Sequence, residues 1–532
     1  MQTIETKRKN IVEVFLKKGL LVNHDLLKYL ENEKNLSEFC RLIEGESSKD
    51  MAVLSDKIKD LFGCEQNLQL DWPELEKFKA TSEKKGNDDN KHLFEQILVH
   101  DARDKTTEKI KLDNNVKIVF SYDKIPKKRE ANDFIQYFNN RYEAIEKILK
   151  QRQELQNTTS INRLINKRDR EQVSVIGMVR DKKQTKNNNY ILTVEDKTGH
   201  MNVLVNKNRP DLFRAVQDIV LDEVIGVVGV NGNNIIFANK LLSPDIPLTK
   251  EIKKTKEETY ALFLSDIHIG SKNFLEDDFN RFLKWINCEL GSKTQREIAS
   301  KVKYIFVIGD LVDGCGVYPN QEKELEIKDI KDQYNVCAGF LSKIPPKIKL
   351  IMCPGNHDAM RMAEPQLAVY KDFAEPLYNL PNVTMVSNPS IVNIHSSDNF
   401  PGFDVLIYHG YSFDFYFAEV ESIRNKGGYD RADLLMKFLL QKRHLAPSYT
   451  STLYAPDANT DSLFIDKIPD FFVSGHIHKA AAANYKNVTL ISGSCWQSKT
   501  TFQEKVGHNP EPSRVPIVNL QTRHIKMLKF GK

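Results

Sequence analysis

The sequence has few cysteines, and no two of them are spaced as CxxC: seven occur among 532 residues, an odd number. This excludes a disulfide framework and a zinc ribbon, and it predicts reduced, mostly buried thiols in a cytoplasmic protein. The sequence also lacks any run of about 18 apolar residues, so we expect no membrane-spanning helix. The opening residues, MQTIETKRKN, contain no apolar core, and we therefore expect no signal peptide.

A strong charge of one sign is also missing. The 77 basic and 72 acidic residues leave a net charge of +5, which is only a weak indication of an anionic partner. A hydrophobic content of 40% and a charged content of 28% are typical of soluble globular domains with true cores. The length predicts roughly three such domains.

Composition and periodicity divide the chain into five segments and predict a multidomain α+β protein. Apolar residues at helical spacing predict a small helical domain over 1–64. Residues 65–115 include the polar run SEKKGNDDNK, which is typical of a flexible linker. Residues 116–170 contain one expected strand and one amphipathic helix, leading to a β-rich segment over 171–248 and an α/β domain over 255–532.

The β-rich segment has five short β runs separated by turn signals, with a helix-like piece (DLFRAVQDIV) between the third and fourth. This order predicts an OB-fold barrel, a fold that commonly holds single-stranded nucleic acid or oligosaccharide. Because fold alone does not determine function, a barrel that only packs against a partner remains an equal alternative.

In the α/β domain, strand-like runs alternate with helices, which predicts a sheet layered with helices. Five of these runs end in a polar cluster: SDIH (265–268), GD (309–310), GNHD (355–358), YHG (408–410) and GHIH (475–478). Ligands of open α/β sheets bind outside the carboxyl ends of the strands, so we expect these clusters to face one cleft. The candidate ligating residues are Asp266, His268, Asp310, Asn356, His409, His476 and His478.

The residue types of this set point to metal chemistry. Two carboxylates, one amide and four imidazoles are too many ligands for one ion and suit two ions that share a bridge. Nitrogen and oxygen donors without thiolate suit Mn, Fe or Zn better than Ca²⁺ or Mg²⁺, and among these three we expect Mn²⁺. Two such ions can activate water and stabilise both oxygens of a phosphoryl displacement. A single DxH is more often structural, so the prediction depends on the ordered set of five clusters.

The ordered set resembles that of the calcineurin-like metallophosphoesterases, which include phosphoprotein phosphatases and the Mre11 nucleases. The resemblance implies that Asp310 bridges the two ions. The first ion would then be held by Asp266, His268, Asp310 and His478, and the second by Asp310, Asn356, His409 and His476.

The same resemblance implies two catalytic side chains. His357 would contact the scissile phosphate and protonate the leaving oxygen. Asp313, three residues past the bridging aspartate, would pair with His357 and raise its pKa. An ordinary turn or N-cap role for Asp313 is an equal alternative.

The chain departs from the phosphoprotein phosphatases in two ways. Gly314 stands where they carry a phosphate-gripping arginine, and the third motif reads GNHD where theirs reads GNHE. A phosphomonoester dianion needs a cationic grip, so the loss of the arginine favours a diester.

A wider resemblance covers the chain from about residue 117 onward, with a weaker match at 1–60: the order of domains is similar to that of the small subunit of archaeal D-family DNA polymerase. The matching segments are 119–145, 155–164, 309–322 and 355–366. The resemblance implies a 3′→5′ proofreading exonuclease that partners a large polymerising subunit, DNA and, through the complex, a sliding clamp. An idle scaffold subunit and a small-molecule metallophosphoesterase are the alternatives.

Two further segments allow more than one interpretation. The aromatic run YSFDFYF (411–417) would either stack unpaired bases or fill the core. The basic residues that follow it would either meet phosphates or form a solvated face; they are Arg424, Lys426, Arg431, Lys437, Lys442 and Arg443. The charged segment 317–334 would either gate the cleft or, as we expect, form a solvated helix.

Overall fold

The computed structural model describes residues 20–22, 52–54, 116–124, 127–164 and 170–531, within two compact units, Met1–Lys109 and Ile110–Lys532. In the first unit, strand β1 (Leu20–Val22) pairs in parallel with β2 (Ala52–Leu54). The expectation of helix is wrong for these six residues, because an uninterrupted apolar triplet carries no period that separates helix from strand. The rest of the predicted helical domain (1–64) and the predicted linker (65–115) lie outside the described residues.

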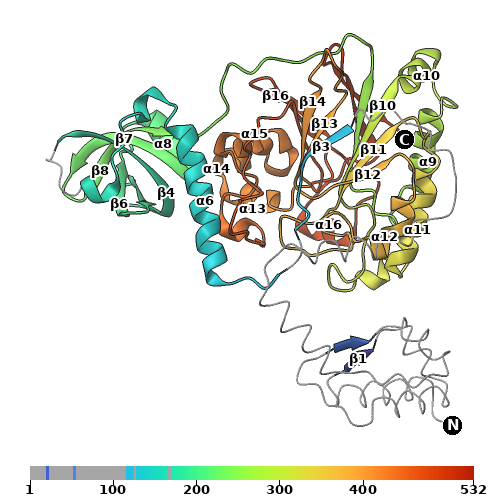
Figure 1. The fold of residues 1–532 in the computed structure, drawn as a ribbon, viewed down its shortest axis with the longest axis horizontal. Helices are drawn as coiled ribbons and strands as arrows, with labels where there is room; N and C mark the ends of the chain where they lie inside the picture. Colours follow the sequence, from blue (N-terminus) through green and yellow to red (C-terminus); the bar gives the residue numbers. More distant parts are fainter. Residues whose placement is uncertain (1–19, 23–51, 55–115, 125–126, 165–169, 532) are drawn as a thin grey trace, which may run out of the picture. The chain divides into compact units, whose positions relative to one another are not determined.

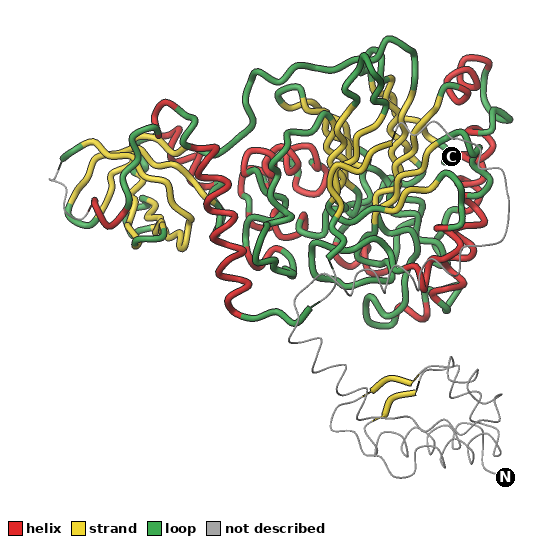
Figure 2. The backbone as a smooth tube through the Cα atoms, viewed as in Figure 1, coloured by secondary structure: helices red, strands yellow, loops and turns green. Residues whose placement is uncertain are grey.

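A closed five-stranded barrel occupies the β-rich segment (Figure 2). Around the barrel the strand order is β4-β5-β6-β8-β7. Along the chain, α8 (Pro210–Gln217) lies between the third strand, β6, and the fourth, β7, as predicted. The strands are β4 (Gln172–Gln184), β5 (Tyr190–Asp196), β6 (Gly199–Val205), β7 (Val224–Gly232) and β8 (Ile235–Leu242). The barrel closes over a core rich in fully buried valine, including Val175, Val194 and Val203. β-branched side chains of this kind fit the pleated interior of a small barrel.

Helix α6 (Ala131–Leu149) links the barrel to the α/β domain, and Figure 1 shows it between them. Its buried residues Tyr137, Arg141, Ile145 and Leu149 recur every four positions and so share one face. Tyr137 packs with the core of the α/β domain, whereas Ile145 and Leu149 pack with barrel residues. The strand that precedes α6 in the chain, β3 (Val116–Ser121), also belongs to the α/β domain, because it forms the edge of one of its sheets.

A buried ion pair fastens α6 to the α/β domain. Arg141 Nε lies 2.7 Å from Asp461 Oδ2, with both side chains almost fully buried, and His444 Nε2 lies 2.8 Å from the same oxygen. We expect Asp461→Ala to lower the free energy of unfolding by about 3–5 kcal/mol, because it leaves a buried guanidinium without its counter-charge. Urea unfolding followed by tryptophan fluorescence measures this.

The matched control for Asp461→Ala is Glu143→Ala on the same helix. Glu143 pairs with Lys197 of the barrel, but both side chains are about half exposed. An exposed pair contributes roughly 0–1 kcal/mol, so this variant should unfold close to the wild type. Equal unfolding midpoints for the two variants would contradict the anchoring role of Arg141.

The α/β domain contains two six-stranded sheets rather than the single sheet expected. The first has the order β12-β11-β10-β9-β18-β19 and the second the order β16-β17-β15-β14-β13-β3. The first comprises β9 (Tyr260–Leu264), β10 (Val302–Ile308), β11 (Lys349–Cys353), β12 (Val383–Met385), β18 (Arg514–Asn519) and β19 (Ile525–Lys529). The second adds to β3 the strands β13 (Ser390–Ile394), β14 (Phe403–Ile407), β15 (Phe471–Ser474), β16 (Ala481–Tyr485) and β17 (Val488–Ser492).

The two sheets pack face to face, with helices on both outer sides (Figure 1). Phe263 and Phe306 of the first sheet share a core with Phe471 of the second. Helices α9 (Glu276–Ile286), α10 (Lys293–Ser300), α11 (Ile330–Leu341) and α12 (Lys371–Tyr378) accompany the first sheet. The second carries α13 (Phe413–Glu419), α14 (Glu421–Arg424) and α15 (Ala432–Lys442). The inner strands of both sheets, such as β9, β15 and β17, are therefore buried on both faces. Strands buried in this way have a continuous apolar pattern whichever sheet they belong to.

The charged segment 317–334 is not the expected solvated helix. It contains a single 3-10 turn at Gln321–Lys323, and α11 begins only after Asp329, whose side chain caps it. The buried Gln333 side chain bonds the main chain of Gly314 and Ile327, and Gln321 bonds Val317 and Asp313. These amide contacts hold the segment as a folded loop close to the polar strand ends.

Five of the cysteines lie among the described residues, and all five are free thiols. Within the same part of the chain, no helix combines the length and the apolar character that a membrane crossing requires. The short helix α16 (Thr501–Val506) carries Gln503, whose side-chain nitrogen lies 2.9 Å from His478 Nδ1.

Candidate metal centre

The strand ends of both sheets supply the predicted ligating side chains. In the first sheet, Asp266 and His268 follow β9, Asp310 follows β10, and Asn356 follows β11. In the second sheet, His409 follows β14, and His476 and His478 follow β15. The expected single rim is thus formed by two sheets, whose adjacent parallel strands end on the same side.

The backbone is held in an unusual conformation at most of these positions. Five of the seven residues have a positive φ, between 49° and 71°: Asp266, His268, Asp310, His476 and His478. A residue with a Cβ is uncommon in this left-handed region, which costs of order 1–3 kcal/mol and is found mainly at functional sites. The concentration of such residues at one place supports a functional use of the strand ends.

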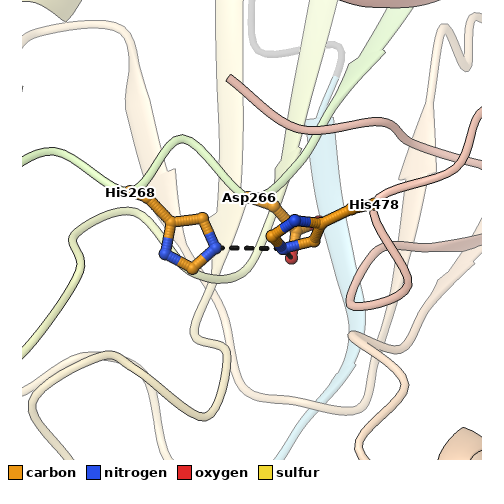
Figure 3. A group of neighbouring side chains, drawn as sticks. All are labelled: Asp266, His268 and His478. Atoms are coloured by element: carbon orange, nitrogen blue, oxygen red, sulfur yellow. Dashed lines mark hydrogen bonds and ion pairs between the residues drawn. The ribbon is translucent and has the colours of Figure 1, made fainter. Parts of the chain in front are cut away.

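The first group of ligating atoms comprises Asp266, His268 and His478 (Figure 3). Nε2 of His268 lies 3.1 Å from Nε2 of His478, and the latter atom lies 3.4 Å from Asp266 Oδ1. Donor atoms that share one cation at bonds of about 2.1 Å stand about this far apart. The group fits a metal ion without rearrangement of the chain.

The second group comprises Asp310, His409 and His476, and Asn356 lies within it. Oδ1 of Asn356 is 3.0 Å from both His409 Nε2 and His476 Nδ1. Oδ2 of Asp310 lies 3.3 Å from His409 Nε2 and 3.8 Å from His268 Nε2. Asp310 therefore stands between the two groups, where a bridging ligand would be.

Hydrogen bonds fix which nitrogen each histidine turns to the centre. His409 Nδ1 donates to the Ile308 carbonyl at 2.9 Å, so Nε2 is the ring nitrogen that faces the centre. His268 Nδ1 lies 3.0 Å from Asp313 Oδ1, and His476 Nε2 lies 3.0 Å from Asp414 Oδ2. A carboxylate or carbonyl that accepts the far ring N–H orients a metal-ligating histidine and raises its basicity.

The Asp313 side chain does not pair with His357 as predicted. Its carboxylate contacts His268, and it is the main-chain carbonyl of Asp313 that accepts from His357 Nδ1, at 2.7 Å. The reason is that a side chain leaving the turn after β10 reaches the neighbouring strand end of β9, while the carbonyl faces the other way. Gln497 and Gln321 complete the contacts of this carboxylate.

Several supporting side chains are not among the site residues predicted from the sequence. Asp414 lies on α13, and Asn388 accepts from the His409 backbone N–H at 2.8 Å. Asp358, the last residue of GNHD, accepts from the backbone of Leu311 and Gly355 and from the Tyr334 hydroxyl. Asp358 thus holds the two turns that carry Asp310 and Asn356, which accounts for an acidic residue at that position.

The buried carboxylates and imidazoles of the centre compensate one another. Burial disfavours the charged form of Asp310, but His409 and His357 hold the pKa of this carboxylate well below its usual range. Burial likewise opposes charge on His409, yet Asp310 raises the pKa of that imidazole to about 10. Protons on such imidazoles compete with a metal ion for the same donor atoms, so a bound cation would take over the neutralising role.

Glycines allow the turns of the centre to approach one another. A Cβ on Gly355 would lie 2.2 Å from Asp310 Oδ1, so we expect Gly355→Ala to displace this carboxylate. A disturbed ligand support typically lowers metal affinity by about 10–100-fold, and calorimetric titration with Mn²⁺ measures this. Gly339→Ala in α11 is the control, because nothing lies within 4 Å of its added Cβ. Equal Mn²⁺ affinities of the two variants would show that the turn at Gly355 accommodates the added methyl group without moving the Asp310 carboxylate.

The aromatic run after His409 divides between core and surface. Phe413, Tyr416 and Phe417 are buried in the core, whereas Tyr411 and Phe415 line a cavity. Among the basic residues that follow, Lys442 pairs with Glu223 of the barrel and Arg443 is held by main-chain carbonyls. These two buried side chains serve as structural links and do not offer their charge to a phosphate.

Comparison with known proteins adds three relatives and one family. The model of the calcineurin-like phosphoesterase family matches residues 260–480. A protein of Methanothermobacter thermautotrophicus named DNA polymerase II small subunit is 42% identical over 403 residues, covering 76% of this chain and 80% of that protein. Proteins of the same name from Pyrococcus furiosus and Archaeoglobus fulgidus are each 38% identical, over 74% and 76% of this chain and over 63% and 78% of their own lengths.

Proposed function

The chain belongs to the family of archaeal DNA polymerase II small subunits, and from this membership we propose that it is a metal-dependent 3′→5′ exonuclease acting on single-stranded or mismatched DNA ends. The observation that carries the proposal is the convergence of seven side chains with oxygen or nitrogen donor atoms at the ends of two sheets. A scaffold subunit with no chemistry of its own has no need of such a centre, nor of its strained backbone.

The residues of the centre divide into two ligand groups. Asp266, His268 and His478 would hold one divalent ion, and Asn356, His409 and His476 a second, with Asp310 shared between them. Two such ions, when bound, would activate a water molecule and stabilise the charge on the phosphoryl oxygens. The donor set, with no thiolate, suits Mn, Fe or Zn better than Ca²⁺ or Mg²⁺, and we propose Mn²⁺ as the ion bound.

In this proposal His357 donates a proton to the leaving oxygen. Its Nδ1 donates to the Asp313 carbonyl, so Nε2 is the ring atom left to exchange a proton with a substrate. The ring is half-buried and lies beside the ligating His268, with centroids 4.8 Å apart. Asp313, through its contact with His268, acts in the proposal as a positioning residue for the first ligand group.

The loop after Asp310 supports a diester substrate. A Cβ on Gly314 would lie 2.3 Å from the His357 carbonyl oxygen, and Gly314 has a φ of +77°. An arginine therefore has no room where the phosphoprotein phosphatases place theirs. Without that cationic grip, the singly charged phosphodiester of a nucleic acid suits the site better than a monoester dianion.

We also infer that the chain works beside a large polymerising subunit and contacts DNA. This follows from the name of its relatives, which describes one subunit of a DNA polymerase. The barrel and α6 are joined to the phosphoesterase domain by buried contacts. We propose the barrel and α6 as the surface that binds the large subunit.

The proposal is tested by incubating the full chain with Mn²⁺ and single-stranded DNA labelled at either end in turn. A 3′→5′ exonuclease shortens the 5′-labelled strand stepwise and releases the 3′ label as a mononucleotide. Cleavage from the 5′ end would refute the polarity. A chain that binds no metal and cuts nothing in Mn²⁺, Mg²⁺ or Zn²⁺ would be a scaffold, and rapid turnover of small phosphate esters without DNA cleavage would indicate a small-molecule phosphoesterase.

A further inference from the structure

A cavity of about 530 Å³ opens beside the candidate metal centre. One wall comes from the residues after β14, namely Tyr411, Asp414 and Phe415. The other comes from the segment 449–454, where Tyr449 and Leu453 leave 47% and 60% of their surface exposed. Two large apolar side chains at the mouth of a cavity next to a reactive centre are typical of a ligand site.

The first wall is in direct contact with the metal centre. Asp414 Oδ2 lies 3.0 Å from Nε2 of the predicted ligand His476. The Tyr411 ring packs edge-on against the same imidazole, with centroids 5.9 Å apart. A group bound in the cavity therefore lies next to a phosphate bound at the centre.

The chemistry of the lining selects a neutral planar group. The cavity presents aromatic rings, several hydroxyls and the Asp414 carboxylate, with no lysine or arginine among its lining residues. A phosphate would meet a negative charge there and no cation. A nucleobase is neutral, has two π-faces and carries exocyclic groups that bond to hydroxyls and carboxylates.

We propose that this cavity binds the unpaired nucleobase next to the scissile phosphodiester, with Tyr449 as the ring on which it stacks. The proposal rests on the function proposed above and adds the feature of the substrate that the site recognises. A base inside a duplex is already stacked and paired, and it would have to leave the helix to enter. The cavity thereby supplies a physical reason for preference for single-stranded or frayed 3′ ends.

The second wall is rigid before any ligand arrives. The Ser448 backbone N–H donates to the Tyr416 hydroxyl, which donates in turn to Ser451 Oγ, each at 2.9 Å. The Tyr449 N–H donates to Asp222 Oδ2 of the barrel, also at 2.9 Å. Because the wall is already fixed by the core and the barrel, binding costs little ordering of the protein.

The test measures KM for two proteins, the wild type and one variant, on two substrates that differ only in the presence of bases at the 3′ end. Tyr449→Ala is compared with wild type on two Mn²⁺-supported substrates: an oligothymidylate and the same strand with abasic residues at its last two 3′ positions. Loss of one stacking contact should raise KM for the normal strand by about 5–150-fold, the range for stacking a single base. On the abasic strand the variant and the wild type should have the same KM, because neither has a base to stack.

Leu290→Ala is the control, since it also removes an exposed apolar side chain, at 41% exposure, away from the cavity. It should match the wild type on both strands. An equal loss for Tyr449→Ala on both strands would mean that the tyrosine acts on the backbone or the fold, and no loss on either would mean another occupant. Both results overturn the proposal.

A DNA-binding measurement distinguishes failure of the proposed exonuclease function from failure of the proposed nucleobase site. If the wild-type chain cuts neither strand, fluorescence anisotropy with labelled normal and abasic strands, without metal, still reports the cavity. A base-dependent affinity that disappears in Tyr449→Ala then supports the nucleobase site although the nuclease function fails. Equal affinity of the wild type for both strands overturns the site itself.

Discussion

Replacing Asp310 by asparagine is expected to remove DNA cleavage and to lower metal content together. Asp310 is the side chain that stands between the two ligand groups, within 3.3 Å of His409 Nε2 and 3.8 Å of His268 Nε2. An amide is a far poorer ligand than a carboxylate and cannot offer a charged oxygen to each group. Because bound metal supplies several kcal/mol and each 1.4 kcal/mol is a factor of ten, the rate should fall by about 10³-fold or more.

Elemental analysis of the dialysed protein and the cleavage assay measure the two effects of Asp310→Asn. Asparagine keeps an oxygen that can accept the His357 backbone N–H, which Asp310 Oδ1 accepts at 2.8 Å, so the turn should remain folded. Asp398→Asn, the same change at an exposed position, is the matched control. If the variant retains two metal ions per chain and cuts DNA at the wild-type rate, Asp310 is not a ligand of the metal centre.

Replacing His357 by alanine is the second change with a large expected effect. We expect a loss of about 10²–10⁴-fold in DNA cleavage, the usual contribution of a positioned proton donor, with metal content unchanged. The loss should shrink on a 4-nitrophenyl phosphodiester, because that leaving group departs without a proton. This dependence on the leaving group is specific to a proton donor and would not follow from damage to the fold.

The metal content of His357→Ala separates two roles for this ring. Side-chain nitrogens of His268 and His357 and an Asp310 oxygen also lie close enough together to share an ion. If the variant loses metal, His357 is a ligand and the proposed proton transfer is wrong. His524→Ala, an exposed histidine at the turn between β18 and β19, is the control and should match the wild type.

The seven candidate ligating residues could be predicted because each follows a strand-like apolar run, where a polar side chain is uncommon. A glycine beside Asp310, Asn356 and His476 marks a turn, and a polar side chain after an apolar run needs a partner. The five barrel strands and their helix could be predicted for a similar reason, since turn signals separate the β runs from one another. Local pattern was sufficient wherever the feature depended on neighbouring residues.

Features that depend on which segments meet in space could not be predicted. Strands β9 and β14 are both five-residue runs made mostly of apolar residues, so the sequence did not reveal that they belong to different sheets. Asp414 and Asn388 support two histidines, but each is an ordinary polar residue in its own segment. The wrong pairing of Asp313 has the same origin, because a spacing of three residues does not determine whether a side chain or a carbonyl faces His357.

The division of the centre between two sheets has a consequence for protein synthesis. His268 and His478 are 210 residues apart, and β18, which flanks β9, follows later still. A chain that is still emerging from the ribosome cannot close the first sheet or bring the late histidines to the early aspartates. A chain truncated before β15 therefore lacks His476 and His478, and the two ligand groups can assemble only after residue 478 has been synthesised.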